Sequence, residues 1–150
     1  MTDRSSRLAL LAAAVLALVV AACGSTAASP TPPLRVSVGP TVPASTLPME
    51  VDVARAAQMR DAGAFILDVR ELDEWVTGHI PDATLISLGS LASRAGEVPT
   101  DRDIVVVCRS GNRSAQGRDI LLKAGFVAVT SMTGGMNEWV AAGLPVATGE

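Results

Sequence analysis

Histidine and cysteine are scarce in this sequence, and their scarcity limits the metal chemistry open to the chain. The 150 residues contain one histidine, His79, and two cysteines, Cys23 and Cys108. One imidazole and one free thiol do not make an ordinary zinc site, because such a site takes three or four protein ligands. The sequence therefore indicates no metal site, and we expect no other cofactor.

The chain also lacks an apolar run long enough to cross a membrane. From Leu8 to Ala22 there is no charged or polar side chain, but these fifteen residues fall short of the ~20 that a membrane-spanning helix needs. Arg4 and Arg7 precede the run, and small residues close it. A basic start, an apolar middle and a small-residue end are typical of a secretory signal peptide, which we assign to residues 1–22.

The end of this run resembles the lipobox of bacterial lipoproteins, Val20-Ala21-Ala22-Cys23-Gly24, with Val20 where leucine is commoner. The resemblance implies that the Cys23 thiol carries a diacylglycerol and that cleavage makes Cys23 the first residue of the mature chain. Two or more acyl chains would anchor the protein stably. We therefore expect an exported lipoprotein, on the outer face of a bacterial cell membrane or in the periplasm. An ordinary cleaved signal peptide is the alternative.

Residues 23–47 have the composition of a linker. Gly24 to Leu47 include five prolines, eight serines or threonines and a single charged residue, Arg35. Large apolar side chains are too few here to offset the entropy that folding would cost. The sequence contains no internal repeat, so residues 48–150 are expected to fold as one domain behind a lipid-anchored linker.

Apolar segments alternate with turn residues along this domain, and their periods predict an α/β fold. We expect strands at residues 64–67, 84–87, 103–108 and 126–131, and helices at residues 51–60, 71–76, 88–95, 114–123 and 136–142. Such alternation indicates a mostly parallel central sheet with helices on both faces. Chemistry gathers beyond the carboxyl ends of parallel strands, and Cys108 ends the strand that is richest in β-branched residues.

The thiol of Cys108 stands alone if Cys23 is lipidated. Exported proteins tend to have their thiols oxidised to disulfides, yet no partner for a disulfide would remain in the chain. Cys108 is then either an inert buried side chain or a reactive one. Residues 109–114 lead through a glycine-containing loop into a helix start, where converging N–H groups favour an anion and lower the pKa of a thiol.

Positive charge is concentrated near this thiol, although the domain is acidic. Residues 48–150 carry nine basic and fourteen acidic side chains, a net charge of −5 (9 − 14). Arg109, Arg113 and Arg118 nevertheless fall within eleven residues that contain no acid. We interpret Arg109 and Arg113 as a cationic mouth for a small anionic substrate, and Arg118 as a charge on a solvated helix face. We expect no nucleic-acid partner.

The segment from Cys108 to Ser114, CRSGNRS, resembles the active-site loop of the rhodanese family. Other motifs of that family follow in the same order along the chain: LDVR at 67–70, GHIPDA at 78–83, GG at 134–135 before Trp139, and GLP at 143–145. Family members usually have glycine where Asp82 stands, a loop position that we expect to tolerate the change. The resemblance covers the whole of the folded domain and implies a rhodanese-like three-layer fold.

The resemblance also implies a sulfurtransferase, an enzyme that carries a sulfane sulfur on its cysteine as a persulfide. Cys108 would take the outer sulfur of thiosulfate or a related donor and pass it to a thiophilic acceptor, cyanide or a thiol. A protein sulfur donor or acceptor fits the same cycle. The donor and the persulfide would be bound by the loop residues Arg109, Ser110, Gly111, Asn112, Arg113 and Ser114. Asp68 and Arg70 would support the loop through ion pairs or hydrogen bonds.

Two other functions stay open. The first is a membrane-tethered persulfide carrier or docking module, which needs Cys108 equally but has little turnover alone. The second is a phosphatase or arsenate reductase, because related phosphatases share the fold. Those enzymes usually have a Cys-x5-Arg loop preceded by histidine, whereas here Val107 precedes the cysteine and four residues separate Cys108 from Arg113. The shorter loop suits sulfur better than phosphate.

Five further residues are interpreted as structural. His79 belongs to a loop that braces the fold in the rhodanese family, and a hydrolase role would require it to be hydrogen-bonded to Cys108. Trp75 and Trp139 occupy the apolar sides of short helices and are expected in the core. Gly134 and Gly135 are interpreted as backbone geometry and not as a phosphate cradle.

Overall fold

A computed structural model of the chain describes residues 46–149. Within this range five strands form one parallel sheet in the order β1-β5-β4-β2-β3. They are β1 (Glu50–Val51), β2 (Phe65–Asp68), β3 (Thr84–Leu85), β4 (Ile104–Val107) and β5 (Val129–Met132). Because β4 is the central strand, its carboxyl end places the next residue, Cys108, at the middle of one edge of the sheet.

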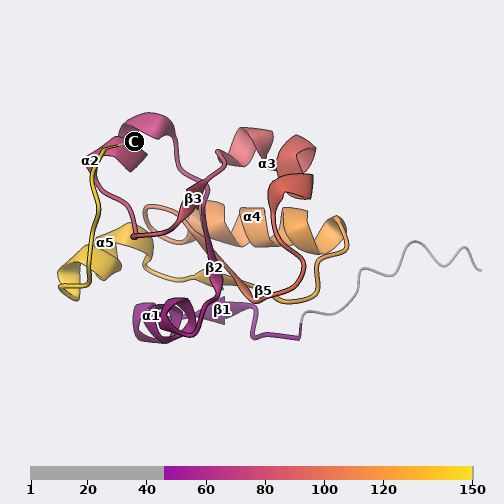
Figure 1. Cartoon of the computed structure of the whole chain (residues 1–150), viewed down its shortest axis with the longest axis horizontal. Coiled ribbons are helices and arrows are strands. Elements are labelled where there is room, and N and C mark those ends of the chain that lie inside the picture. The colour runs from indigo at the N-terminus through magenta and orange to yellow at the C-terminus, as the bar shows by residue number, and fades with distance from the viewer. Residues whose placement is uncertain (1–45, 150) are drawn as a thin grey trace, which may run out of the picture. The chain divides into compact units, whose positions relative to one another are not determined.

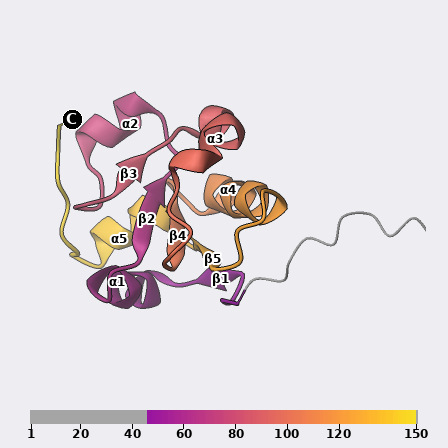
Figure 2. The ribbon, with the colours of Figure 1, turned by 45° about the vertical axis from the view of Figure 1, so that its right-hand side comes forward.

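Five α-helices and one 3-10 turn connect these strands: α1 (Val53–Asp61), α2 (Leu72–Thr77), α3 (Leu88–Arg94), η1 (Ala95–Glu97), α4 (Asn112–Lys123) and α5 (Gly135–Ala141). Helices α1 and α5 lie on one face of the sheet and α3 and α4 on the other, as both views show (Figures 1 and 2). This arrangement confirms the predicted α/β class and its three layers.

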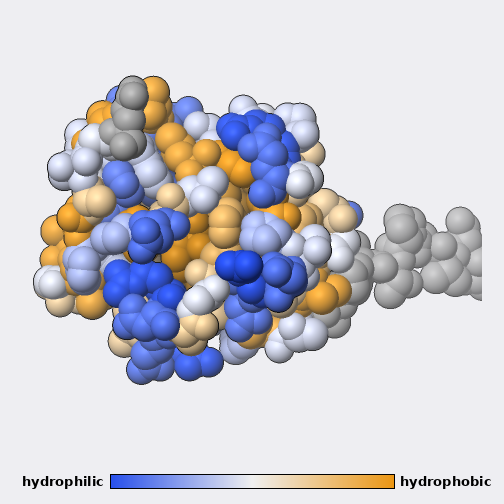
Figure 3. Space-filling view, viewed as in Figure 1, coloured by the Kyte–Doolittle hydropathy of each residue, from blue (hydrophilic) through white to orange (hydrophobic). Residues whose placement is uncertain are grey.

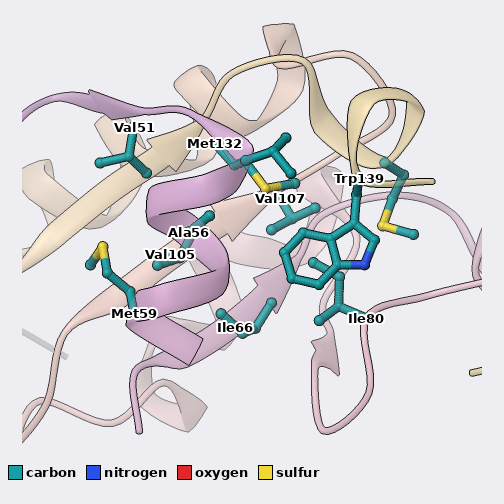
Figure 4. Close-up of a cluster of buried hydrophobic side chains, with 11 residues drawn as sticks. Val51, Ala56, Met59, Ile66, Ile80, Val105, Val107, Met132 and Trp139 are labelled. Carbon is teal, nitrogen blue, oxygen red and sulfur yellow. The ribbon is translucent and has the colours of Figure 1, made fainter. Parts of the chain in front are cut away.

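The apolar core has two halves because the central strand is apolar on both faces. Val105 and Val107 of β4 pack with α1 and α5 in the half that Figure 4 draws, where Trp139 is fully buried. Ile104 and Val106 point the other way, toward α3 and α4. Side chains alternate across a strand, so a continuous run of β-branched residues buries both faces at once. Each fully buried side chain of this size contributes roughly 1.5–3 kcal/mol.

The start of the domain differs from the prediction of a helix over residues 51–60. Glu50 and Val51 instead form the edge strand β1, which pairs with β5. The Asp52 carboxylate then accepts a hydrogen bond from the backbone N–H of Arg55 at 2.7 Å and caps α1. A two-residue strand is too short to show a period of two, so the sequence pattern could not separate it from the helix.

Two other elements begin two or more residues away from their predicted starts. Strand β5 begins at Val129, not at residue 126, because residues 126–128 form a bend before it. Helix α4 begins at Asn112, two residues earlier than expected, since Gly111 adopts a φ of 104° and ends the loop there. Leu121 and Leu122 of this helix are buried, whereas Ile120 is only half-buried.

The departure from the family pattern at Asp82 has a structural meaning. Asp82 has a φ of 64° and is the only residue other than glycine with a positive φ among residues 46–149. Glycine enters this left-handed region without strain, and Asp is one of the few other residues that tolerate it. The position therefore accepts Asp in place of glycine for a conformational reason, and a β-branched residue would be strained there.

The end of the chain returns across α2. His79 and Ala147 exchange two backbone hydrogen bonds of 2.9 Å, and the Gly149 N–H donates to the Val76 carbonyl at 3.0 Å. His79 stacks on Trp75 with ring centroids 3.6 Å apart, and its Nδ1 lies 3.1 Å from the Trp75 carbonyl oxygen. The histidine thus braces α2 and the C-terminal segment, which agrees with its predicted structural role.

Residues 1–22 and most of the predicted linker 23–47 lie outside the described residues. At the described end of that linker, the Thr46 N–H donates to the Val127 carbonyl, and Leu47 packs against the core. No helix in the described part of the chain is long and apolar enough to cross a membrane.

Candidate active site

The loop after β4 curls around the sulfur of Cys108. The Gly111 N–H donates to Cys108 Sγ at 3.1 Å, and the Ser114 Oγ lies 3.7 Å from the same sulfur. Gly111 makes this turn through its left-handed conformation, and α4 begins directly after it. The sequence thus predicted correctly that Cys108 ends a buried strand and faces a helix start.

The environment of Cys108 favours its thiolate. Burial of the side chain raises the pKa of the thiol, but hydrogen bonds from the backbone N–H groups of Ser114, Ser110 and Gly111 and from the Ser114 side chain lower it. The net effect is a pKa below the ordinary value. Since the thiolate is the nucleophilic form of cysteine, this loop activates Cys108.

The first turn of α5 holds the loop in this conformation. The Met136 N–H donates to the Cys108 carbonyl at 2.8 Å, and the Asn137 N–H donates to the Arg109 carbonyl at 3.1 Å. Gly135 makes the approach possible, because a Cβ at this position would lie within 2.6 Å of the backbone of Ser110. Gly134 and Gly135 both have positive φ, so they serve backbone geometry, as predicted.

The other side chains of the loop divide into exposed and buried ones. Three of them are exposed at the crest of the loop: Arg109, Ser110 and Asn112. Ser114 is fully buried, and its hydroxyl lies 2.7 Å from the Gly111 carbonyl oxygen and 3.3 Å from that of Met132. No described acid or carbonyl accepts a hydrogen bond from the Arg109 side chain within residues 46–149. The roles predicted for these residues toward a substrate stay predictions.

Arg113 is held by an acid that the sequence analysis did not single out. Its two terminal nitrogens donate to the two Glu74 carboxylate oxygens, both at 2.7 Å. This bidentate pair lowers the pKa of Glu74 to about 2, against the opposing effect of burial. Glu74 comes from α2, so no local spacing could have paired it with a residue of α4. The expected cationic mouth is therefore partly neutralised from outside the loop segment.

Asp68 and Arg70 form the ion pair that was expected near the loop. The Arg70 guanidinium donates to both Asp68 oxygens, with a shortest distance of 2.7 Å, and also to the Gly78 carbonyl. Both side chains are almost fully buried. Arg70 thereby ties the end of β2 to the loop that follows α2. None of these hydrogen bonds reaches residues 108–114, so the predicted support of the cysteine loop stays a prediction.

Arg118 is not a charge on a solvated helix face, as the sequence suggested. It is buried, and its guanidinium donates to the Met49 carbonyl at 3.0 Å and to the Ser131 hydroxyl at 3.1 Å. It also pairs with Asp119 at 2.8 Å. Glu74 of α2 pairs with Arg113, and Asp119 of α4 itself pairs with Arg118. Arg109 is therefore the arginine of the three that is exposed without such a partner among residues 46–149.

A cavity of about 690 Å³ begins at Arg109 and extends between α2, α5 and the C-terminal segment. Its walls include both charged and apolar side chains: Arg70, Asp73, Glu74, Thr77, Gly78, Arg109, Met136, Asn137, Val140 and Val146. In Figure 3, apolar surface lies over the region where Figure 1 places α5. Within residues 46–149 no group of three or more Cys, His, Asp or Glu side chains is arranged to hold a metal ion.

Fold and site together define a class of protein, in which a cysteine at the carboxyl end of a central parallel strand is cradled by the start of a helix. The rhodanese-like domain family matches residues 52–142 of the chain. The chain therefore belongs to the rhodanese-like domain family.

Its relatives are similar over the folded domain. A sulfurtransferase of Allochromatium vinosum is 38% identical over 85 residues, which are 57% of this chain and 79% of that protein. The thiosulfate sulfurtransferase GlpE of Pseudomonas syringae is 35% identical over 85 residues, which are 57% of this chain and 80% of that protein. A rhodanese-related protein from Thermoplasma volcanium has a crystal structure that superposes with a TM-score of 0.63 at 27% identity, covering 68% of this chain and 100% of that one.

A Bacillus subtilis relative, YrkF, for which a sulfur-carrier role is proposed, is 38% identical over 79 residues; these are 53% of this chain and 43% of that protein. At the level of the family, this domain therefore stands among sulfurtransferases and sulfur carriers.

The lowered pKa of Cys108 predicts how its alkylation depends on pH. The thiolate reacts and the thiol does not, so the rate with iodoacetamide should be lost as pH falls through the pKa of Cys108. The midpoint of the profile should lie below that of free cysteine, and Ser114→Ala should raise it because one stabilising contact is removed. The midpoint is measured from alkylation rates at a series of pH values, by stopped flow or by mass spectrometry. A midpoint at or above that of free cysteine would contradict the activation of Cys108.

The Glu74–Arg113 pair predicts a pH-dependent stability. The pKa of Glu74 falls from 4.5 to about 2 on folding, so its contribution is present above pH ~4.5 and is lost as pH falls through about 2. We expect Glu74→Gln to lower the free energy of unfolding at neutral pH by on the order of 1–2 kcal/mol, allowing for solvent screening of a partly exposed pair. Urea denaturation measures the free energy of unfolding of both proteins at pH 7 and near pH 3. The difference between the parent protein and Glu74→Gln should be smaller near pH 3.

The matched control for this pair is Glu97→Gln. Glu97 pairs with Arg94 at 2.7 Å, but both side chains are exposed. An exposed pair contributes little, so the control should leave the free energy of unfolding unchanged. Equal effects of the two substitutions would show that the Glu74 pair is no more than a surface contact.

Proposed function

We propose that this protein is a sulfurtransferase whose Cys108 carries a sulfane sulfur as a persulfide. The supporting observation is the buried thiol with a lowered pKa, held by the N–H groups of its loop at the carboxyl end of the central strand. A lone activated thiol, with no histidine or acid hydrogen-bonded to it among the described residues, suits direct sulfur exchange better than a hydrolytic triad. Membership of the rhodanese-like family supports the same chemistry.

The cycle has two balanced steps. The Cys108 thiolate attacks the outer sulfur of thiosulfate, the S–S bond of thiosulfate breaks, and sulfite leaves with its electron pair. The product is the anion Cys108–S–S⁻. Cyanide or a thiolate then attacks the outer sulfur, forming thiocyanate or a persulfide and returning the Cys108 thiolate. No oxidant or reductant is consumed.

The loop supplies stabilisation at each stage. N–H groups that hold the thiolate at rest are positioned to hold the charge of the terminal sulfur in the persulfide. Arg109, exposed at the crest, is placed to attract an anionic donor. Arg113 is held in a fixed position, because both of its terminal nitrogens donate to Glu74. Its charge is therefore less available to a donor than that of Arg109.

A persulfide carrier or docking module is the second candidate, and the similarity to the Bacillus subtilis protein favours it. It requires the same persulfide but little turnover without a partner. Steady-state assay with thiosulfate and cyanide separates the two: sustained turnover identifies an enzyme, and a stable persulfide without turnover identifies a carrier.

The predicted persulfide gives the central test. Incubation of the purified protein with thiosulfate and no acceptor should add the mass of one sulfur atom to Cys108, and cyanide should remove it. Cys108→Ser should gain no mass, because a serine hydroxyl is not ionised at neutral pH. Intact-mass spectrometry and peptide mapping measure both. An unchanged mass in the parent protein, together with release of phosphate from an aryl phosphate, would replace sulfur transfer by phosphatase chemistry.

We also propose that the domain is exported and anchored by a lipid on Cys23. The support lies in the sequence alone: the basic start, the apolar run of residues 8–22 and the lipobox-like residues around Cys23. The linker before the domain would then separate it from the membrane surface.

Cys23→Ser tests the anchor, because serine cannot accept the thioether-linked diacylglycerol. The variant should leave the membrane fraction or accumulate as the unprocessed precursor, as measured by fractionation and immunoblot. Unaltered mature size and unaltered membrane partition would rule out lipidation and favour an ordinary cleaved signal.

A further inference from the structure

The cavity beside Cys108 has an apolar wall that the transfer of sulfur from thiosulfate to cyanide does not use. Val140 on α5 and Val146 in the C-terminal segment line it, and they are 56% and 40% exposed. They are two of only five large hydrophobic side chains that are exposed within residues 46–149. Met136, which is buried, joins them at the base of α5. Exposed apolar side chains that gather in a concave site indicate a ligand with an apolar part.

This wall is preformed. The backbone pairing of Ala147 with His79 fixes the segment that carries Val146. Val146 also packs closely on Gly78, since a Cβ at Gly78 would lie 2.9 Å from Val146 Cγ1. A preformed cavity loses little conformational entropy when a ligand binds.

The cavity is larger than the small inorganic substrates of sulfur transfer need. Its volume is about 690 Å³, which lies in the range of roughly 300–1,000 Å³ that organic ligands occupy in proteins. Thiosulfate and cyanide would fill a small part of it. Because Cys108 itself is not in the lining, the cavity would hold a part of the substrate that does not react.

The charge of Arg109 favours an anionic end on that substrate beside the loop. Arg70 and Glu74 also line the cavity, but each is already in a close ion pair, with Asp68 and Arg113 respectively. Asp73 lines the cavity as well and disfavours an anion in its own neighbourhood, so the anionic end is expected at Arg109 and the apolar part elsewhere. Arg109 extends from the crest of the loop and lies at the start of the cavity, beside the nucleophile. A carboxylate that reaches Arg109 gains a charge-assisted hydrogen bond.

We propose that this cavity binds the apolar arm of an organic thiol that bears a carboxylate and accepts the sulfur from Cys108. The proposal rests on the proposed persulfide cycle and names its acceptor class. The acceptor thiolate attacks the outer sulfur of Cys108–S–S⁻; a new S–S bond forms on the acceptor, the old one breaks, and Cys108 leaves as the thiolate. Binding energy from the arm accelerates this step because it positions the attacking sulfur.

Discharge of a preformed persulfide tests the proposal with thiols of matched acidity. The protein is loaded with thiosulfate, and loss of the added sulfur is followed with 3-mercaptopropionate and with 6-mercaptohexanoate. A buried methylene is worth about fourfold, so three methylenes in partial contact should make the longer thiol on the order of tenfold faster. The uncharged 6-mercaptohexanol should discharge the persulfide more slowly than 6-mercaptohexanoate does. The difference between the two rates should become smaller at high salt, because salt screens the attraction between the carboxylate and Arg109.

The double variant Val140→Ser/Val146→Ser should reduce this preference for the longer thiol to about twofold or less. Val127→Ser is the matched control, because Val127 is 43% exposed and does not line the cavity; it should keep the full preference. Discharge by cyanide should be the same in all three proteins. Equal rates for the two thiols in the parent protein, or an unchanged preference in the double variant, would overturn the proposal. Formation of the persulfide is measured first, by the mass that thiosulfate adds before any thiol is present. If no persulfide forms at that stage, the proposed function itself is refuted.

Discussion

The chemistry of this domain depends on two hydrogen bonds that run from the first turn of α5 to the carbonyls of Cys108 and Arg109. In a trans peptide the C=O and the next N–H point in opposite directions. Fixing the Arg109 carbonyl on α5 therefore directs the Ser110 N–H away from α5, and this N–H is among those that lower the pKa of Cys108. The backbone N–H groups at the start of α5 thus orient the loop, and the N–H groups of the loop in turn favour the thiolate. Gly135 makes this possible because no side chain could occupy that contact.

Two of the arginines near the thiol are in ion pairs with acids. Asp68 neutralises Arg70 inside the protein, and Glu74 neutralises Arg113 at its edge. An unpaired buried guanidinium would be costly, whereas these pairs leave the surroundings of the thiol almost neutral. The thiolate is consequently stabilised by directed N–H groups more than by nearby positive charge. Under the proposed function, Arg109 at the crest would attract the anionic donor, so that capture of the donor and activation of the nucleophile would rest on different groups.

Much of this could be predicted from the sequence, and the failures have physical causes. The strand before Cys108 was evident because its apolar β-branched residues serve a sheet that is covered on both faces. Edge strand β1 was missed because two residues carry no period. Arg118 looked solvated because its partners, Met49 and Ser131, come from β5 and the start of the domain. Glu74 was overlooked because it lies 39 residues from Arg113 and meets it only in the folded domain.

The dimensions of the loop bear on the choice between sulfur and phosphate. Gly111 reaches back to Cys108 Sγ at 3.1 Å, so its N–H is already engaged with the sulfur of the cysteine. In a cradle for a tetrahedral oxyanion the N–H groups would instead be directed at oxygens beyond the nucleophile, and the arginine after the loop would lie across them. Here Arg113 is turned toward Glu74. A loop that closes on the sulfur of the cysteine and keeps its arginine engaged offers a tetrahedral oxyanion few free N–H groups and no free guanidinium, and this supports the proposed sulfur transfer over phosphatase chemistry.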